Sequence, residues 1–150
     1  MGLRIVQVDA FTDTPFAGNP AAVCVLPAPR QAQWMQHLAL ELSLSETAFQ
    51  CRRAAGLDLR WFTPAVEADL CGHATFASAH VLWEDGHLSM DTPACFHTRS
   101  GLLTATRQDA WISLDFPALP PEPVTAPEAL VQALHVTPLY GGQKPLILSS

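Results

Sequence analysis

Alternating and continuous apolar positions predict several short strands in the first 116 residues. Polar and apolar residues alternate over 4–9, which is typical of a strand with one buried face, whereas the unbroken apolar run at 21–26 indicates a fully buried strand. Between them, residues 12–20 are dense in turn-forming residues and predict a loop. Two further strands are predicted to end near residues 53 and 64, and four more to form an antiparallel meander over 88–91, 95–99, 102–107 and 111–116.

Two segments of this region have helical periodicity. The first begins at residue 29 or 30 and ends near Ser43, and its apolar face is predicted to contain Trp34, Leu38 and Leu42 together with Met35 and Ala39. The second follows a loop at 65–70 and ends near residue 86, and its residues leave no clear polar side, which predicts a buried helix. We therefore expect an α+β lobe in which a curved, mostly antiparallel sheet wraps around this central apolar helix.

The C-terminal part of the chain is rich in proline and predicts a change of domain. We assign residues 1–118 to the first lobe and 119–127 to a stiff, extended linker. Residues 128–150, with a helix near 127–134 and a strand near 145–149, are predicted to begin a second lobe that is incomplete here. The alternatives are that this segment packs on the first lobe or on another chain.

Composition narrows the classes of partner. The formal net charge is −6, which argues against nucleic acid or an anionic membrane as the partner. No apolar run approaches the length of a membrane span, and the sequence begins directly with a strand pattern. The four cysteines form no C-x-x-C pair, so we expect free thiols and a cytoplasmic protein.

The start of the apolar helix is a candidate anion-binding site. Its first free N–H groups, together with the helix dipole, attract a carboxylate or phosphate, and they are expected at Gly72, His73, Ala74 and Thr75. Asp69 and Thr75 are suited to the entry turn, and Gly72 allows a tight turn or close approach of a ligand. The alternative is a packing helix with no ligand.

Glu46 and Cys71 are candidates for proton transfer. Glu46 lies between a helix and a strand among apolar neighbours, a setting that suits a general acid/base, although it could equally be a polar turn residue. Cys71 precedes the helix, where a thiol can have a lowered pKa, but buried inert cysteines are common. His73 could bind substrate or hold Glu46, and Asn19 offers an amide to a polar substrate.

No metal or cofactor is expected from the sequence. His73 and His80 are seven residues apart, and no second pair with ligand spacing accompanies them. The sequence contains no phosphate-binding loop, dinucleotide fingerprint or G-x-S-x-G motif.

Four ordered motifs resemble the phenazine-biosynthesis PhzF-like family. They are VDAFTDTPFAGNPAAV at 8–23, LSETAF at 44–49, RWFTP at 60–64 and LCGHAT at 70–75. The resemblance implies the diaminopimelate epimerase fold, in which two similar lobes, each a curved sheet around a central helix, enclose the active site. The family's second lobe carries an Asp-Pro-x-Thr-Gly-like motif, and this sequence contains none.

The resemblance also implies roles for particular residues. Glu46 matches the glutamate that shifts a proton between carbons of a small amino-acid-derived acid in a cofactor-independent isomerase. Gly72 and His73 match the substrate-binding helix end, and Asn19 matches the loop that faces the cleft. Cys71 falls where the epimerases place a catalytic cysteine, although other members of the family lack a thiol there.

Three functional hypotheses follow. The first is a PhzF-like isomerase acting on a small anionic, amino-acid-like substrate, with Glu46 as the acid/base. It would work as a homodimer or with a chain that supplies the second lobe. The second is a thiol-based epimerase that uses Cys71. The third is a non-catalytic lobe that serves as a binding or assembly module.

Overall fold

The computed structural model describes residues 2–118 and 120–143. The chain divides into two compact units, Met1–Phe116 and Pro117–Ser150. Each unit is described separately below. Within the described residues, no helix combines the length and apolar composition that a membrane crossing requires.

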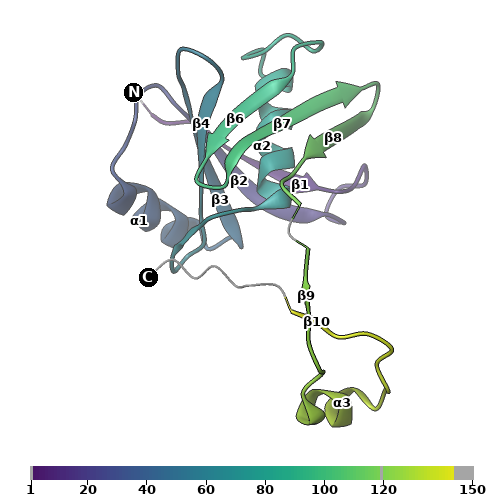
Figure 1. The fold of residues 1–150 in the computed structure, drawn as a ribbon. Helices are drawn as coiled ribbons and strands as arrows, with labels where there is room; N and C mark the ends of the chain where they lie inside the picture. Colours follow the sequence, from purple (N-terminus) through teal and green to yellow (C-terminus); the bar gives the residue numbers. More distant parts are fainter. Residues whose placement is uncertain (1, 119, 144–150) are drawn as a thin grey trace. The chain divides into compact units, whose positions relative to one another are not determined.

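A single curved sheet of eight strands forms the first unit (Figure 1). Most neighbouring strands are antiparallel, and β2 with β3 and β4 with β6 are the parallel pairs. The strands are β1 (Ile5–Ala10), β2 (Asn19–Leu26), β3 (Glu46–Arg52), β4 (Leu57–Phe62), β5 (Glu67–Ala68), β6 (Ala94–Thr98), β7 (Gly101–Gln108) and β8 (Trp111–Asp115). The predicted α+β lobe with a mostly antiparallel sheet is therefore confirmed.

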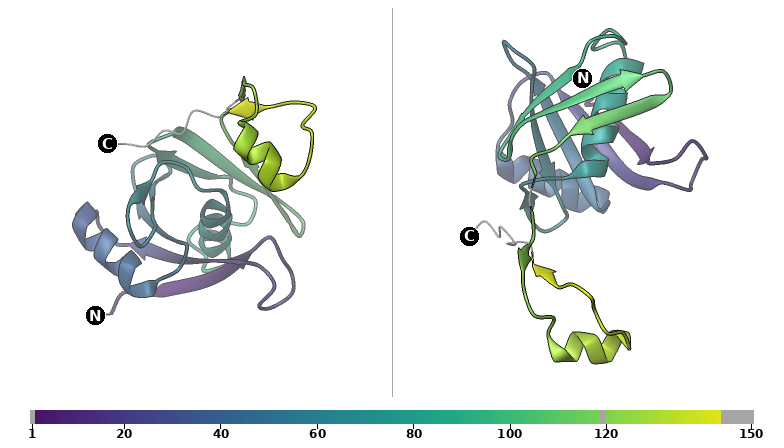
Figure 2. Two further views of the ribbon diagram at one scale, coloured as in Figure 1. Left: turned by 90° about the horizontal axis from the view of Figure 1, so that it is seen from below. Right: turned by 45° about the vertical axis from the view of Figure 1, so that its right-hand side comes forward.

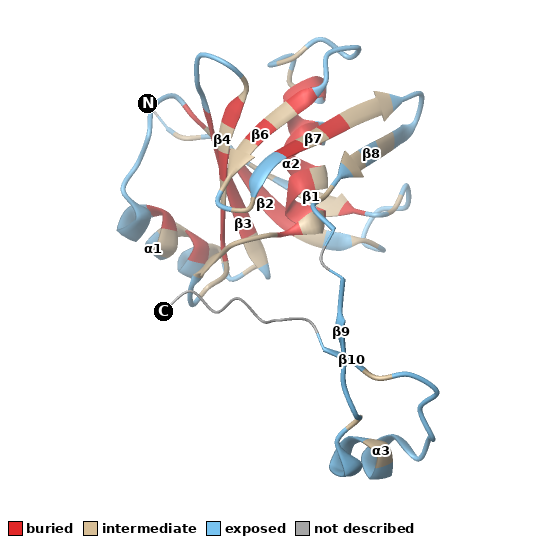
Figure 3. Cartoon of the chain, in the orientation of Figure 1, coloured by how far each residue is buried: buried red, intermediate tan, exposed pale blue. Residues whose placement is uncertain are grey.

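Helix α2 (Gly72–Glu84) fills the hollow of this sheet. The strands curve around the helix when it is viewed end-on (Figure 2, left), and most of its residues are buried (Figure 3). Its small residues allow close approach of the strands, and the indoles of Trp61 and Trp83 complete the core. The prediction of a buried helix without a polar side is confirmed, because nine of its 13 residues are buried.

Helix α1 (Ala32–Leu42) packs on the outer face of the sheet. Met35 and Ala39 are its buried residues, and they lie against a cluster that includes Phe49 and Phe62. Both residues belong to the predicted apolar face of this helix. Trp34 lies at the rim, 38% exposed, and contacts Phe49 edge-on at a centroid distance of 6.1 Å.

Three local predictions differ from the structure. Residues 88–91 form no strand, because the Leu88 N–H donates to the Leu82 carbonyl and folds the chain back onto the end of α2. The predicted loop at 65–70 contains the short strand β5, which pairs with the end of β4. Strand β2 begins at Asn19, inside the predicted loop, because its pairing with β1 extends to Ala10.

The second unit contains little buried structure in its described part. Strands β9 (Glu122–Pro123) and β10 (Gly142–Gln143) pair antiparallel, so the predicted linker contains a short paired segment. Helix α3 (Glu128–Leu134) agrees with the predicted helix and has no buried residue. The predicted strand at 145–149 lies outside the described residues.

Candidate active site

The parallel pairing of β2 and β3 brings the candidate residues to one edge of the sheet. Ala21 of β2 pairs with Glu46, so the first residues of both strands lie at the same end. Asn19 begins β2 and is exposed, and Glu46 begins β3. The side chain of Glu46 reaches His73, the second residue of α2, which places the start of this helix at the same edge.

His73 is the centre of a polar cluster. Its Nε2 lies 3.3 Å from Glu46 Oε2 and 3.3 Å from Ser45 Oγ. Its Nδ1 lies 3.5 Å from Cys71 Sγ. The His73 side chain is 10% exposed and the Glu46 side chain 21%, so the carboxylate is the more accessible of the two. These contacts hold the His73 imidazole at both of its nitrogens, and the imidazole in turn positions the Glu46 carboxylate.

The N-terminus of α2 has no side-chain cap. Cys71 is the N-cap residue, and no side-chain hydrogen bond closes the first turn. Asp69, which we expected to suit this turn, lies 3.6 Å from Arg99 instead. The Thr75 hydroxyl donates to the Cys71 carbonyl, so it too leaves the first N–H groups open. Uncapped N–H groups at a helix start are suited to an anion.

Gly72 leaves open space beside this turn. A Cβ atom at this position would meet only Phe116 Cζ, at 4.0 Å, and the backbone does not require glycine. Of the two properties that glycine allows here, a tight turn or close approach of a ligand, the open space agrees with the second. Ala74 and Thr75 are fully buried, so their side chains are not exposed to a substrate, and the free N–H groups of this turn are those of Gly72 and His73.

Burial dominates the electrostatic environment of Cys71. It is the main reason that the pKa of this thiol is raised to about 11; the Ala74 amide acts in the opposite direction, and the negative charge of Glu46 adds a smaller increase. Of the two alternatives that the sequence left open, a lowered pKa at a helix N-terminus or a buried inert thiol, the burial agrees with the second.

Glu46, Cys71 and His73 have the spacing of a possible metal site. Their ligand atoms all lie within 4.8 Å of one another. The spacing of histidines in the sequence pointed only to His73 with His80, which is exposed, and gave no sign of this grouping. A cysteine binds metal as the thiolate, and burial disfavours that form here. The trio therefore suits proton transfer better than metal binding.

Two further residues support this cluster and were not assigned a role from the sequence. Ser45 contacts His73, and only its position beside Glu46 could have indicated this. Asp9 Oδ2 accepts a hydrogen bond of 3.1 Å from the Phe16 N–H. This bond holds the loop that leads into Asn19, and Phe11 in the same loop packs against Phe76 of α2 at a centroid distance of 5.1 Å.

The chain is similar to several known proteins. An uncharacterized isomerase of Halalkalibacterium halodurans is 54% identical over 144 residues, which cover 95% of this chain and 54% of the relative. A phenazine biosynthesis-like domain-containing protein of Homo sapiens is 44% identical over 131 residues, or 82% of this chain and 45% of the relative. The chain thus spans about half the length of the curated relatives it matches.

Solved structures agree with this likeness. A PhzF-family protein of Enterococcus faecalis superimposes with a TM-score of 0.83 at 39% identity, covering 93% of this chain and 54% of that one. A hydroxyproline epimerase of Agrobacterium vitis, 14% identical with a TM-score of 0.56, covers 81% of this chain and 42% of that one and shares the fold. The sequence model described as phenazine biosynthesis-like protein matches residues 8–145. This chain therefore belongs to the phenazine biosynthesis-like (PhzC-PhzF) family.

Proposed function

We propose that this chain is the N-terminal part of a cofactor-independent isomerase that moves a proton on a small, amino-acid-like carboxylate. The observation that carries the proposal is the contact of 3.3 Å between Glu46 and His73 at the uncapped start of α2. A proton acceptor and an anion-binding helix end thereby share one site. The names of the relatives, which include isomerases, support the same reaction class.

In the proposed reaction, Glu46 is both the base and the acid. Its carboxylate removes a proton from a substrate carbon that a neighbouring group of the substrate activates. The electron pair of the broken C–H bond remains on the substrate as a carbanion or enolate. The N–H groups at Gly72 and His73 stabilise this negative charge. The protonated Glu46 then returns the proton to a different position, so atoms and electrons balance without a cofactor.

The remaining groups position the reactants. His73 holds the Glu46 carboxylate and is itself held by Ser45 and Cys71. Asn19, exposed at the same edge, would bind a polar group of the substrate. A homodimer partner or a chain that supplies a second lobe would close the other side of the site. A cytoplasmic location remains part of the proposal, and the four free cysteines agree with it.

The alternative of a thiol base receives less support. A thiol whose pKa is raised to about 11 is almost wholly protonated near neutrality, whereas a general base must be deprotonated. The carboxylate of Glu46 is also more accessible than Cys71, which is 8% exposed.

The test is deuterium exchange from D2O into a panel of small amino acids and cyclic amino-acid derivatives, measured by NMR of the compounds. It uses the enzyme with its second lobe present, either in the same chain or supplied by a partner. We expect exchange at one substrate carbon and its loss in Glu46→Gln. Glu41→Gln, which removes an exposed carboxylate of α1, is the matched control and should exchange normally. Exchange at an unchanged rate in Glu46→Gln would exclude Glu46 as the base.

A separate titration of the same protein in H2O, followed by amide NMR, tests the binding-module hypothesis. Shifts of the Gly72 and His73 amide resonances without any exchange would favour a non-catalytic lobe. If no compound in the panel moved these resonances, the helix end would not be an anion site, and the proposal would fail at its first step.

A further inference from the structure

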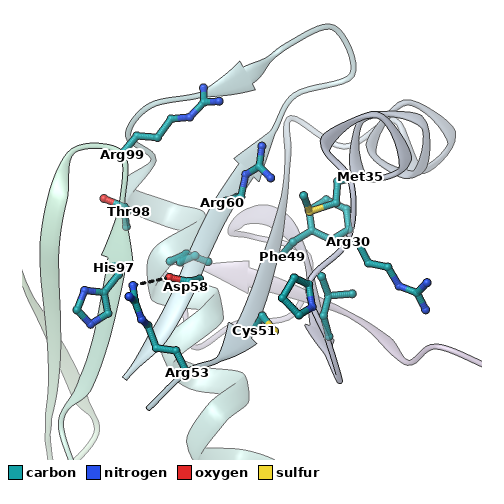
Figure 4. Close-up of a pocket in the computed structure, with 13 residues that line it drawn as sticks. Arg30, Met35, Phe49, Cys51, Arg53, Asp58, Arg60, His97, Thr98 and Arg99 are labelled. Carbon is teal, nitrogen blue, oxygen red and sulfur yellow. Dashed lines mark hydrogen bonds and ion pairs between the residues drawn. The ribbon is translucent and has the colours of Figure 1, made fainter. Parts of the chain in front are cut away.

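A groove lies on the face of the sheet opposite to α2. Alternate residues of β3 point to opposite faces, and Gln50 donates to the Ser78 carbonyl of α2. Phe49 and Cys51 therefore point away from that helix, toward α1. They line a groove of about 370 Å³, within the size range of small-molecule sites. Figure 4 shows His97 and Thr98 of β6 on one side, and Met35 on the other.

The groove gathers basic residues in an acidic protein. The chain has eight lysine and arginine residues against 14 acidic ones. Four of these eight, Arg30, Arg53, Arg60 and Arg99, line the groove, and Asp58 is its one acidic lining residue within the described part of the chain. They come from separate segments of the sequence, so folding brings them together. This arrangement favours an anionic ligand.

The arginines are held in place and retain free donors. Arg60 donates through Nε and Nη2 to Glu67, at 2.6 and 2.7 Å, and Arg99 Nη2 lies 2.7 Å from the same carboxylate. Arg53 Nη1 bonds to Asp58 at 2.8 Å, the dashed line in Figure 4. Each guanidinium carries five N–H donors, so these bonds leave several unused on every arginine.

Arg30 is positioned differently. Its guanidinium carbon lies 5.5 Å from the centre of the Trp34 ring, and among the described residues no carboxylate pairs with it. Stacking on an aromatic ring orients an arginine without neutralising it. The four arginines of the groove outnumber the three carboxylates nearby. These carboxylates are Asp58 in the lining, and Glu67 and Asp69 behind it.

We propose that this groove binds a small organic dianion whose apolar ring packs on Pro29 and the floor of the groove while its charged group meets the arginines. A phosphate ester and a dicarboxylate present the same chemistry to arginine, whose planar fork matches both. The site is separate from the proposed active site, because it lies on the other face of the sheet. It does not depend on the isomerase activity.

The test is titration of the 150-residue chain with phenyl phosphate and with phthalate, followed by calorimetry and amide NMR. We expect saturable binding that shifts resonances of residues 51–60 and 97–99 more than those of 71–75. Inorganic phosphate should bind several-fold more weakly, because it lacks the ring, and phenol should not bind. Comparing the two dianions distinguishes a phosphate ligand from a dicarboxylate.

Three variants test the role of the arginines. Arg53→Gln should weaken binding about three- to fivefold, the range for partly exposed charge pairs. Asp58→Asn should tighten binding, because it removes the acidic lining residue and frees Arg53. Arg4→Gln is the matched control: its side chain, 71% exposed, pairs with Asp85 outside the groove, and it removes the same charge.

The contrary results are specific. Equal weakening by Arg4→Gln and Arg53→Gln would mean that only the overall charge matters, and the site would be rejected. Weaker binding in Asp58→Asn, or equal affinity for inorganic phosphate and phenyl phosphate, would also overturn the proposal. Resonance shifts confined to 71–75 would assign the anion to the helix end instead.

Discussion

The environment of Cys71 predicts how fast this thiol reacts. Its pKa is raised from an ordinary value of 9.0 to about 11, chiefly by burial. At pH 7 the thiolate fraction then falls from about one in a hundred to about one in ten thousand. Since the thiolate is the reactive form, alkylation by iodoacetamide should slow by about a hundredfold from this effect alone.

The assay compares Cys71 with Cys95 in the same chain. Cys95 is only partly buried, so its peptide serves as an internal reference when alkylation is followed by mass spectrometry. Cys71 should react far more slowly at pH 7. Glu46→Gln should accelerate its alkylation, because the charge of Glu46 raises the Cys71 pKa. If Cys71 reacted as fast as Cys95 in the unchanged chain, our account of its burial would be wrong and the thiol-based epimerase would regain support.

Two further predictions concern the hairpin beside the site and the stability of the fold. In Gly18→Ala the new Cβ would lie 2.6 Å from the Ala10 carbonyl oxygen, so Asn19 should move and the exchange rate should fall. Gly2→Ala, where the new Cβ meets nothing within 4 Å, should leave the rate unchanged. Urea unfolding should show stability falling between pH 9 and 11, because burial raises the pKa of Cys24 to about 11 while the unfolded thiol titrates near 9.0. Folded protein keeps the proton in this window and unfolded protein loses it, so the Cys24 contribution of roughly 2–3 kcal/mol is present below pH 9 and lost above it. A Cys24→Ala variant with an equally steep decline would contradict this assignment.

Features set by local pattern were predicted well from the sequence. Helix α2 is apolar on every side. A helix of this kind is buried by other elements on all its faces, so its central position could be predicted from its composition. The strand predicted at residues 88–91 is absent because the Leu88 N–H donates to the Leu82 carbonyl and forms a turn instead. The pattern of apolar residues alone does not distinguish such a turn from a short strand.

The contact between Glu46 and His73 could not be predicted from local sequence patterns. The two residues are far apart in the sequence, and their contact depends on the parallel pairing of β2 with β3 and on the direction of α2. The residue types suggested that His73 could hold Glu46, and the family resemblance assigned both residues to one active site. The arginine groove had no such guide, because its residues come from several elements and match no motif.

The charges near Glu46 indicate that an anionic substrate would need a second binding surface in addition to this lobe. At about 5 Å from the ionised Glu46, a substrate carboxylate is repelled by roughly 3 kcal/mol at an effective dielectric constant of about 20. The N-terminus of a helix stabilises a bound anion by only about 0.3–2 kcal/mol. The arginines that could balance the difference line a groove on the opposite face of the sheet. On the proposed function, a substrate anion would therefore need cationic or N–H groups from a second lobe or another chain, and closure of those groups over Glu46 is expected to raise its affinity.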